Sequence, residues 1–277
     1  MKNWLLNTLR TAVILLSATL LITSCQQSDF DEPLLDGETV TISFKGSIDS
    51  QAQSRAWEWD GGNVDVLYFE LYVDQSRIER KEFDVTDGNI VNFKIELLKN
   101  MTYTAVFWAQ KNDCKVYNKE KLNDIRIDYS KISSDFSAIS NCDAFHAAFP
   151  FTVDQATIEN GVDVKLTRPF ALIIAGVNDI ASGAATSITV SNVATKFNFN
   201  FNKFSYEASG EASPTFNFTP DGTILVPGKS HKMIGMAYVL PLKDTVTTVT
   251  VKTPSKESSI TLEKLEANKR YNILSAQ

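Results

Sequence analysis

A period-two alternation of apolar and polar residues recurs along this chain and limits the fold more than any other feature. In "TVTISFKGSI", residues 39–48, Val40, Ile42 and Phe44 alternate with polar residues. Such alternation places the apolar side chains on one face, which is the pattern of a half-buried β-strand. Turn signals such as "DG", "PG" and "NG" separate the alternating segments, so we predict an all-β fold made of β-sandwiches. The further alternating segments are residues 91–97, 162–166, 197–202 and 248–251.

Helical periodicity is scarce. "YNKEKLNDIRI" at 117–127 and "SKISSDFSAI" at 130–139 could each supply a turn or two of helix. Hydrophobic residues make up 43% of the chain, which is enough for a sizeable core. We therefore expect a β-protein with few short helices.

A short internal repeat suggests two domains. "LLKNMTYT" at 97–104 and "LEANKRYN" at 265–272 share the pattern Leu-x-x-Asn-x-x-Tyr. Because Asn tolerates a left-handed backbone, we expect in both a strand, a tight turn at the Asn and a new strand at the Tyr. With the length of the chain, the repeat predicts an N-terminal sandwich over residues 39–152 and a C-terminal sandwich over residues 153–277.

The first residues have the layout of a secretory signal. Lys2 and Arg10 supply positive charge, and residues 11–22 form an apolar run shorter than the roughly 20 residues that span a bilayer. Small residues then lead to Cys25, as in a bacterial lipobox. We predict that residues 1–24 are removed and that Cys25 is acylated, which anchors the protein in outer-membrane lipid because several acyl chains together bind stably. The alternative is an ordinary cleaved signal with an incidental cysteine.

Residues 25–38 form an acidic stretch behind that cysteine. "SDFDE" at 28–32 resembles the short acidic export signal of Bacteroidetes lipoproteins that reach the outer face of the outer membrane. We therefore expect a lipid-anchored protein of the cell outer membrane that faces the extracellular side. The alternative is a solvated acidic tether, since such stretches do not pack.

The charge of the chain argues against nucleic acid as a partner. Removal of residues 1–24 takes away Lys2 and Arg10 but no acidic residue, so the net charge moves from −6 to −8. The sequence shows no basic cluster. An acidic protein of this kind binds phosphate backbones poorly.

The remaining cysteines leave two interpretations open. With Cys25 acylated, Cys114 and Cys142 could pair in an oxidising compartment. They could equally be two buried thiols, because sequence alone does not establish that their Cα atoms come close enough.

The search for chemistry finds no catalytic, metal or cofactor site. His146 and His231 are the two histidines, and neither belongs to a spaced ligand pair or a nucleophile elbow. His146 is expected to be a packed or rim residue. Glu58, Asp60 and Asp65 could supply the two carboxylates that glycoside hydrolysis needs, but scattered acids in an acidic β-protein are usually solvated. We therefore expect no enzyme activity and no cofactor.

Aromatic residues near the N-terminus offer a binding alternative. Trp57 and Trp59 in "RAWEW" lie at i and i+2 and share one face of a strand. If exposed with Trp108, they could form a sugar-stacking platform; if buried, they are core anchors. A separate segment, Asp244-Thr245-Val246, resembles the short O-glycosylation acceptor of exported Bacteroidetes proteins, and is otherwise a loop that enters a strand.

The chain as a whole resembles the fimbrillin-like surface lipoproteins of Bacteroidetes, and within them a Bacteroides domain family of unknown function. The resemblance implies two tandem transthyretin-like, Greek-key β-sandwiches, assembly into pili or surface adhesins, and no enzyme activity. Beside the lipobox at Cys25, it rests on "SRAW" (54–57), "AVFWAQ" (105–110), "CDAF" (142–145), "RPFALIIAGV" (168–177) and "LEANKRYNI" (265–273).

The resemblance also implies a mechanism of assembly. In polymerising members an Arg-specific protease removes the segment before an arginine, and a strand of the next subunit fills the groove that is left, by strand addition. Arg55-Ala56 matches the cleavage position, in a polar loop at residues 49–56, and the strand at 39–48 lies upstream. Partners would then be other fimbrial subunits, or host or bacterial surface ligands.

Two readings of the role stay open. "NKRYNILSAQ" follows the final core strand without an extra donor segment, which favours a tip, an anchor or a non-polymerising relative, unless the last strand is itself the donor. The alternative function is a glycan-binding surface lipoprotein associated with polysaccharide uptake. Exposed Trp57, Trp59 or Trp108 would favour that alternative.

Overall fold

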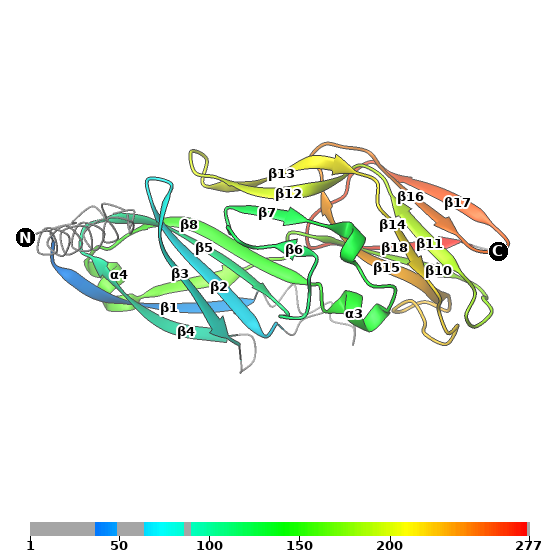
Figure 1. Cartoon of the computed structure of the whole chain (residues 1–277), viewed down its shortest axis with the longest axis horizontal. Coiled ribbons are helices and arrows are strands. Elements are labelled where there is room, and N and C mark those ends of the chain that lie inside the picture. The colour runs from blue at the N-terminus through cyan, green and yellow to red at the C-terminus, as the bar shows by residue number, and fades with distance from the viewer. Residues whose placement is uncertain (1–36, 49–63, 86–89, 276–277) are drawn as a thin grey trace, which may run out of the picture. The chain divides into compact units, whose positions relative to one another are not determined.

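The computed structural model describes residues 37–48, 64–85 and 90–275. Within these residues the chain forms eighteen strands in four sheets, with three short helices between them (Figure 1). The predicted all-β sandwich class is confirmed. No helix in this part of the chain is long and apolar enough to cross a membrane.

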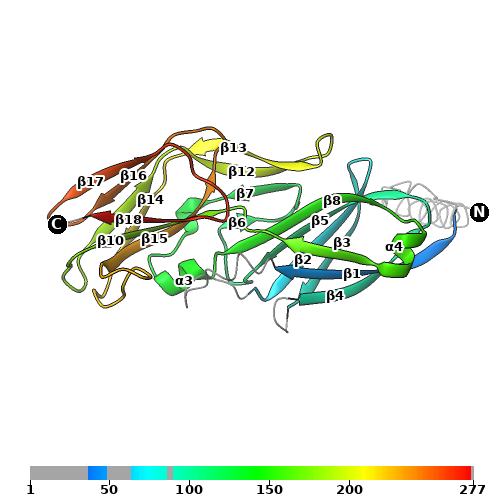
Figure 2. The ribbon, with the colours of Figure 1, turned by 180° about the vertical axis from the view of Figure 1, so that it is seen from behind.

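Two sheets enclose the first hydrophobic cluster, and we call them the first sandwich. One sheet has the order β4-β1-β9, with strands Ile90–Leu98, Thr39–Ile48 and Val162–Leu166. The other has the order β3-β2-β5-β8, with strands Ser76–Asp84, Val66–Val73, Thr102–Gln110 and Ala144–Thr152 (Figures 1 and 2). The alternating segments at 39–48, 91–97 and 162–166 therefore become β1, β4 and β9, as predicted.

The remaining two sheets form the second sandwich. The larger runs β18-β10-β15-β12-β7-β6, and β13 pairs with β12; in that order its strands are Arg270–Ser275, Ala171–Val177, Lys232–Pro241, Val193–Asn200, Asp124–Ile127, Tyr117–Asn118 and Ser205–Ala212. The smaller runs β14-β11-β16-β17, with strands Thr215–Phe218, Thr186–Val190, Thr247–Lys252 and Glu257–Leu262.

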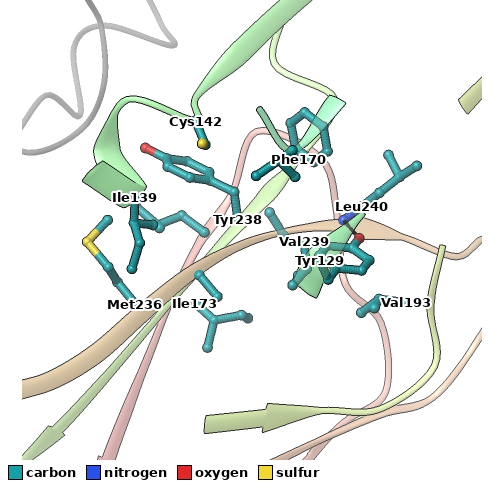
Figure 3. Packing of buried hydrophobic residues seen from close by; sticks show 14 of the residues in the cluster. Tyr129, Ile139, Cys142, Phe170, Ile173, Val193, Met236, Tyr238, Val239 and Leu240 are labelled. Carbon is teal, nitrogen blue, oxygen red and sulfur yellow. Dashed lines mark hydrogen bonds between the residues drawn. The ribbon is translucent and has the colours of Figure 1, made fainter. Parts of the chain in front are cut away.

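Strand β15 lies at the centre of the second core. Its residues Met236, Tyr238 and Val239 are buried, as Figure 3 shows. Gly235 on the same strand has no room for a side chain, because a Cβ there would come within 2.5 Å of Ile188 and 2.6 Å of Phe218. The second core is thus closed by a backbone approach that requires glycine.

A buried tyrosine ties a short helix to this core. The 3₁₀ helix η1, Tyr129–Lys131, places Tyr129 so that its hydroxyl donates to the Ala194 carbonyl at 2.7 Å and accepts from the Leu240 N–H at 3.0 Å (Figure 3). The buried Tyr129 hydroxyl, the Ala194 carbonyl and the Leu240 N–H therefore all have hydrogen-bond partners inside an apolar cluster.

Strand β2 is buried on both faces. Leu67, Phe69 and Leu71 belong to the cluster of the first sandwich. Val66 and Tyr68, on the opposite face, belong to the cluster that fills the second sandwich. The two clusters share strand β2, and β9, which follows residue 152 in the sequence, pairs with β1. The predicted division into domains 39–152 and 153–277 stays a prediction.

The helix predictions are half right. The segment at 130–139 contains η1 and α3, Phe136–Ser140. The segment at 117–127 is not helical but forms β6 and β7, because Ile125 and Ile127 alternate with polar residues and are buried by the period of a strand. Helix α4, Gln155–Asn160, was not predicted; Asp154 caps its start by accepting from the Thr157 N–H at 2.8 Å.

The two Leu-x-x-Asn-x-x-Tyr segments occupy matching turns. Asn100 and Asn268 have positive φ angles of 63° and 57°. Their N–H groups donate, both at 2.8 Å, to the carbonyls of Val153 and Phe170. The predicted strand after each Asn is present, as β5 and β18. Before the second Asn, however, β17 already ends at Leu262, so this connection is a longer loop than predicted.

Each turn is closed by the hydroxyl of its tyrosine. The Tyr103 hydroxyl accepts from the Leu98 N–H at 3.1 Å, and the Tyr271 hydroxyl accepts from the Glu266 N–H at 2.9 Å. Both acceptors lie five residues after their donors, which is the arrangement of a tyrosine corner in β-sandwiches. In both cases the chain crosses there from one sheet of a sandwich to the other.

Candidate functional site

Strand β1 is the candidate site, because it holds the centre of its sheet. It pairs antiparallel with β4 along nine positions, from Thr39 opposite Leu98 to Ser47 opposite Ile90. On its other edge it pairs parallel with β9, but only over residues 44–48. The second half of β1 is therefore hydrogen-bonded on both edges and its first half on one.

The inward face of β1 enters an aromatic cluster. Ile42 and Phe44 have 0% and 1% of their surface exposed. The Phe44 ring lies 5.2 Å from Phe93 in a stacked arrangement and 5.5 Å from Phe151 edge-on, measured between ring centroids. Such ring pairs stabilise a core beyond the area that they bury. The alternation that predicted this strand thus reflects a deep contribution to the first core.

The connection between α4 and β9 passes close to β1. Gly161 ends α4 with φ of 72°, and a Cβ there would lie 2.6 Å from the Ser43 carbonyl oxygen. Glycine satisfies both the positive φ and the close approach. Figure 2 shows α4 beside the first part of β1. The loop thereby covers the edge of β1 where β9 has not yet begun.

Several predicted site residues lie outside the described residues. They are the lipidation site, the cleavage position and the tryptophan pair, namely Cys25, Arg55, Ala56, Trp57 and Trp59. Their roles stay predictions. The cleavage position and the tryptophan pair fall between Ile48, where one described range ends, and residue 64, where the next begins.

Two other candidates have structural roles. Trp108 is fully buried, and its indole N–H donates to Gln110 Oε1 at 2.8 Å, so it offers no face to a sugar. Asp65 accepts from the Asn112 N–H at 2.6 Å and so ties the start of β2 to the turn that follows β5. Glu58 and Asp60, its proposed partners in a carboxylate pair, lie outside the described residues.

The histidine in "DAFHAAF" is packed, as expected. His146 lies edge-on to Phe197 and Tyr206, with ring centroids 4.7 and 4.8 Å away. The residue is half-buried, but its Nδ1 is shielded from solvent without a hydrogen-bond partner. This removal from water lowers the pKa of His146 to about 3. In the described residues no group of three or more His, Cys, Asp or Glu side chains could hold a metal ion.

The segment Asp244-Thr245-Val246 is a turn that leads into β16. Asp244 has φ of 54°, and Thr245 Oγ1 donates to the Lys243 carbonyl at 3.1 Å. Val246 is 51% exposed. The loop interpretation is therefore confirmed, and glycosylation of Thr245 stays a prediction.

A buried arginine joins three of the sequence motifs that carry the family resemblance. Arg168 of "RPFALIIAGV" donates from Nε and Nη2 to both carboxylate oxygens of Asp143 in "CDAF", at 2.6 and 2.5 Å. Its Nη1 donates to Asn268 Oδ1 in "LEANKRYNI" at 3.1 Å. Sequence reasoning missed this cluster, because its members are 25 and 100 positions apart. The available signal was one Arg and one Asp in motifs made mostly of apolar residues, "RPFALIIAGV" and "CDAF".

The two cysteines after Cys25 are joined. Cys114 and Cys142 form a disulfide with their Cα atoms 5.2 Å apart. The Tyr117 hydroxyl donates to the Cys142 carbonyl and so ties β6 to the same point. The disulfide fixes the segment that follows β5 against the start of β8.

Comparison with known proteins identifies a family. A family model described as a family of unknown function (DUF6562) matches residues 35–269. No curated protein matches the sequence. A match over this share of the chain establishes membership, as the resemblance to a fimbrillin-like family of unknown function implied.

Several solved structures from Bacteroides and Porphyromonas are similar to this chain. A candidate adhesin from Bacteroides ovatus has a TM-score of 0.54 and 9% identity, over 86% of this chain and 88% of that chain. A candidate polysaccharide-binding protein from Bacteroides thetaiotaomicron has a TM-score of 0.52 and 10% identity, over 85% and 90%. The fimbrial anchor protein Mfa2 from Porphyromonas gingivalis has a TM-score of 0.48 and 12% identity, over 84% and 90%. The chain therefore belongs to the family of unknown function DUF6562 and shares its fold with a candidate adhesin and a candidate polysaccharide-binding protein of Bacteroides.

Proposed function

We propose that this protein reaches the cell surface as a lipid-anchored structural or adhesive protein, and that cleavage at Arg55 then frees it from the lipid to enter fimbriae as a tip, anchor or subunit by β-strand exchange. The observation that carries the proposal is the position of β1. A strand that precedes the Arg55 segment holds the centre of a sheet and fills an aromatic core. The fold shared with a candidate adhesin supports a surface role.

The energetics of β1 explain why its loss would drive assembly. Ile42, Phe44 and Ile48 are at most 8% exposed. Burial of each such side chain stabilises a protein by about 1.5–3 kcal/mol. Cleavage at Arg55 with release of β1 would therefore expose the edges of β4 and β9 and an apolar groove between them. An extended strand from another subunit would satisfy both the backbone and the pockets.

The deciding measurement is N-terminal sequencing and intact mass of the protein recovered from the surface of its native cells. Strand exchange predicts a chain that starts at Ala56 and carries no lipid. A chain that starts at acylated Cys25 and retains β1 would contradict strand exchange and leave a surface anchor or stand-alone adhesin.

An Arg55→Ala variant tests the processing step directly. We expect it to stay membrane-bound and to enter no high-molecular-weight fimbrial ladder on gels of unboiled samples. Arg126→Ala serves as the matched control, because Arg126 is exposed in β7. Release and assembly of Arg55→Ala at the level of the control would rule out cleavage at this position.

A glycan-binding surface lipoprotein is the second candidate. It is favoured by the fold shared with a candidate polysaccharide-binding protein and by Trp57 and Trp59. Binding on a glycan array that is lost in Trp57→Ala/Trp59→Ala would support it. The exposed Phe204, changed to Ala, is the control for loss of an aromatic surface residue. An array without a tryptophan-dependent signal would remove this candidate.

A further inference from the structure

A concave pocket of about 560 Å³ lies among β3, β6, β7 and η1, away from β1. Its volume falls in the range of small-ligand sites. Five cationic side chains and two acidic ones, Glu120 and Asp128, line it, although the chain as a whole carries a net charge of −6. The cationic residues are Arg80, Lys115, Lys119, Arg126 and Lys131.

Two of these cations are not held in ion pairs, although the more distant carboxylates of Glu82 and Asp65 act on Lys119. Within the described residues, neither Lys115 nor Lys119 forms an ion pair. Lys115 Nζ donates to the Asn112 carbonyl at 3.1 Å. Lys119 Nζ lies 4.2 Å from the centroid of the Tyr68 ring, in a cation–π contact. Partial burial lowers the pKa of Lys119, because it removes water from the charged ammonium group. A bound anion would stabilise that charge in place of the missing water.

The other charges of the pocket are partly engaged. Arg126 pairs with Asp124 at 3.1 Å, and Lys131 pairs with Asp128 at 3.4 Å. All four side chains are at least 33% exposed, and exposed pairs of this kind contribute little free energy. Both cations can therefore turn toward a stronger anion at small cost.

A buried carboxylate holds the wall of the pocket in place. Glu70 on β2 is fully buried and accepts from Arg80 Nη1 and from the Leu122 N–H, the latter at 2.9 Å. Arg80 also donates to the carbonyls of Glu120 and Lys119, both at 2.8 Å. Arg80 thus orders the loop that carries Lys119, and it serves as scaffold more than as a free cation.

The strand pair β6–β7 supplies the rest of the shape. Tyr117 opposite Ile127 faces the core, so Asn118 opposite Arg126 faces the pocket. The disulfide of Cys114 fixes the chain beside Lys115. The cations are therefore presented by an ordered surface, which lowers the entropic cost of binding.

We propose that this pocket binds an acidic saccharide, with Lys115 and Lys119 as the principal contacts to its carboxylate or sulfate groups. The lining is dominated by charged and amide side chains, and its apolar members Val116, Tyr117 and Ile127 are buried. A polyhydroxylated anion satisfies such a lining, whereas a peptide with apolar side chains does not. The site lies on elements other than the Trp57 segment and needs no removal of β1, so it is independent of the proposed function.

Calorimetric titration of the purified protein tests the proposal. The ligands are tetragalacturonate for carboxylates, a heparin tetrasaccharide for sulfates, neutral maltotetraose and tetraglutamate as a size-matched acidic peptide. We expect binding of one or both acidic saccharides. The affinity should fall when the salt concentration rises from about 50 to about 200 mM, because salt screens contacts between exposed charges. Binding of maltotetraose at equal strength, tighter binding of tetraglutamate, or no binding of either acidic saccharide would overturn the proposal.

A charge-matched pair of variants locates the site. Lys115→Gln/Lys119→Gln should weaken binding about tenfold, whereas Lys229→Gln/Lys264→Gln, which removes two exposed lysines elsewhere, should leave it unchanged. Near-UV circular dichroism checks the fold of each. If the half-buried Lys119 proves necessary for folding, Lys115→Gln alone should still weaken binding about threefold, because Lys115 is exposed. Equal affinity of pocket and control variants would disprove the assignment.

Discussion

The first and the last strand of the described chain depend on their sheets in different ways. β1 lies between two partners and buries Ile42, Phe44 and Ile48. β18 lies at the edge of its sheet, pairs only with β10, and buries Ile273 alone. Both strands have a parallel partner, so the difference is one of position. A strand at an end of the described chain can thus lie either between two partners or at the edge of a sheet, and only removal of the former leaves a groove between two strands.

The sharpest test of this comparison is the loss of Phe44. Phe44→Ala should lower the free energy of unfolding by about 3–5 kcal/mol, because it empties the centre of the aromatic cluster. Ile273→Ala in β18 should cost about 2 kcal/mol, the low end for such a change, because an edge can relax. Urea denaturation measures both. The neighbouring Lys45→Ala, on the exposed face, should change the value by less than about 0.5 kcal/mol. Equal costs for Phe44→Ala and Ile273→Ala would break the comparison.

The arginine cluster links the start of β8 to the corner before β18. Arg168→Met removes the guanidinium from the buried Asp143 carboxylate, which stays charged in the core, and should cost about 3–5 kcal/mol. Arg126→Met, which breaks the exposed pair with Asp124, should cost less than about 1 kcal/mol. Thermal unfolding of both variants gives the answer. A small effect at Arg168 would mean that the corner before β18 is held by its tyrosine rather than by the ion pair.

His146 tests the contact between β8 and the hairpin β12–β13. Its pKa in the folded protein, about 3, lies below the ordinary value of 6.5, so the unfolded chain binds the proton first. The contribution of neutral His146 to the free energy of unfolding is complete above pH 6.5. It is lost as the pH falls toward 3, by at most about 1.4 kcal/mol per pH unit. His146→Phe should flatten the dependence of stability on pH between 6.5 and 5. An unchanged slope would show that the ring is hydrated.

The two tyrosine corners make the finest comparison. Tyr103 is 2% exposed, whereas Tyr271 is half-buried. Tyr103→Phe leaves the buried Leu98 N–H without an acceptor and should cost about 1–2 kcal/mol. Tyr271→Phe should cost about 0.5–1 kcal/mol, because water can reach the Glu266 N–H. Chemical denaturation of the two variants measures both losses of unfolding free energy. A larger loss for Tyr271→Phe than for Tyr103→Phe would show that the second corner is the more rigid one.

Alternation predicted the strands that have one buried face. β1, β4, β9, β12 and β16 all appear at the alternating segments. β2, β5, β10 and β15 did not show this pattern, because nearly every residue in them is buried and the polar half of the period is missing. The all-β class could thus be read from the half-buried strands, while the pairing of sheets could not.

The candidate sites divide in the same way. The sequence located β1 and the Asn turns, because each is a local pattern. The Arg168 cluster, the Glu70 scaffold and the basic pocket escaped it, because they gather residues from separate strands. The five pocket cations are spread over residues 80–131, and no stretch of the chain looked basic. Long-range ion pairs and surface charge therefore had to come from the fold.

The double burial of β2 has a consequence for how the protein melts. Its two faces complete two hydrophobic clusters at once, so neither cluster can open without loosening a wall of the other. Folding and unfolding of the described chain should accordingly be one cooperative event, with a single calorimetric peak. Proteolysis would then act on either the folded protein or the fully unfolded chain, because no intermediate with one folded core and one unfolded core is populated.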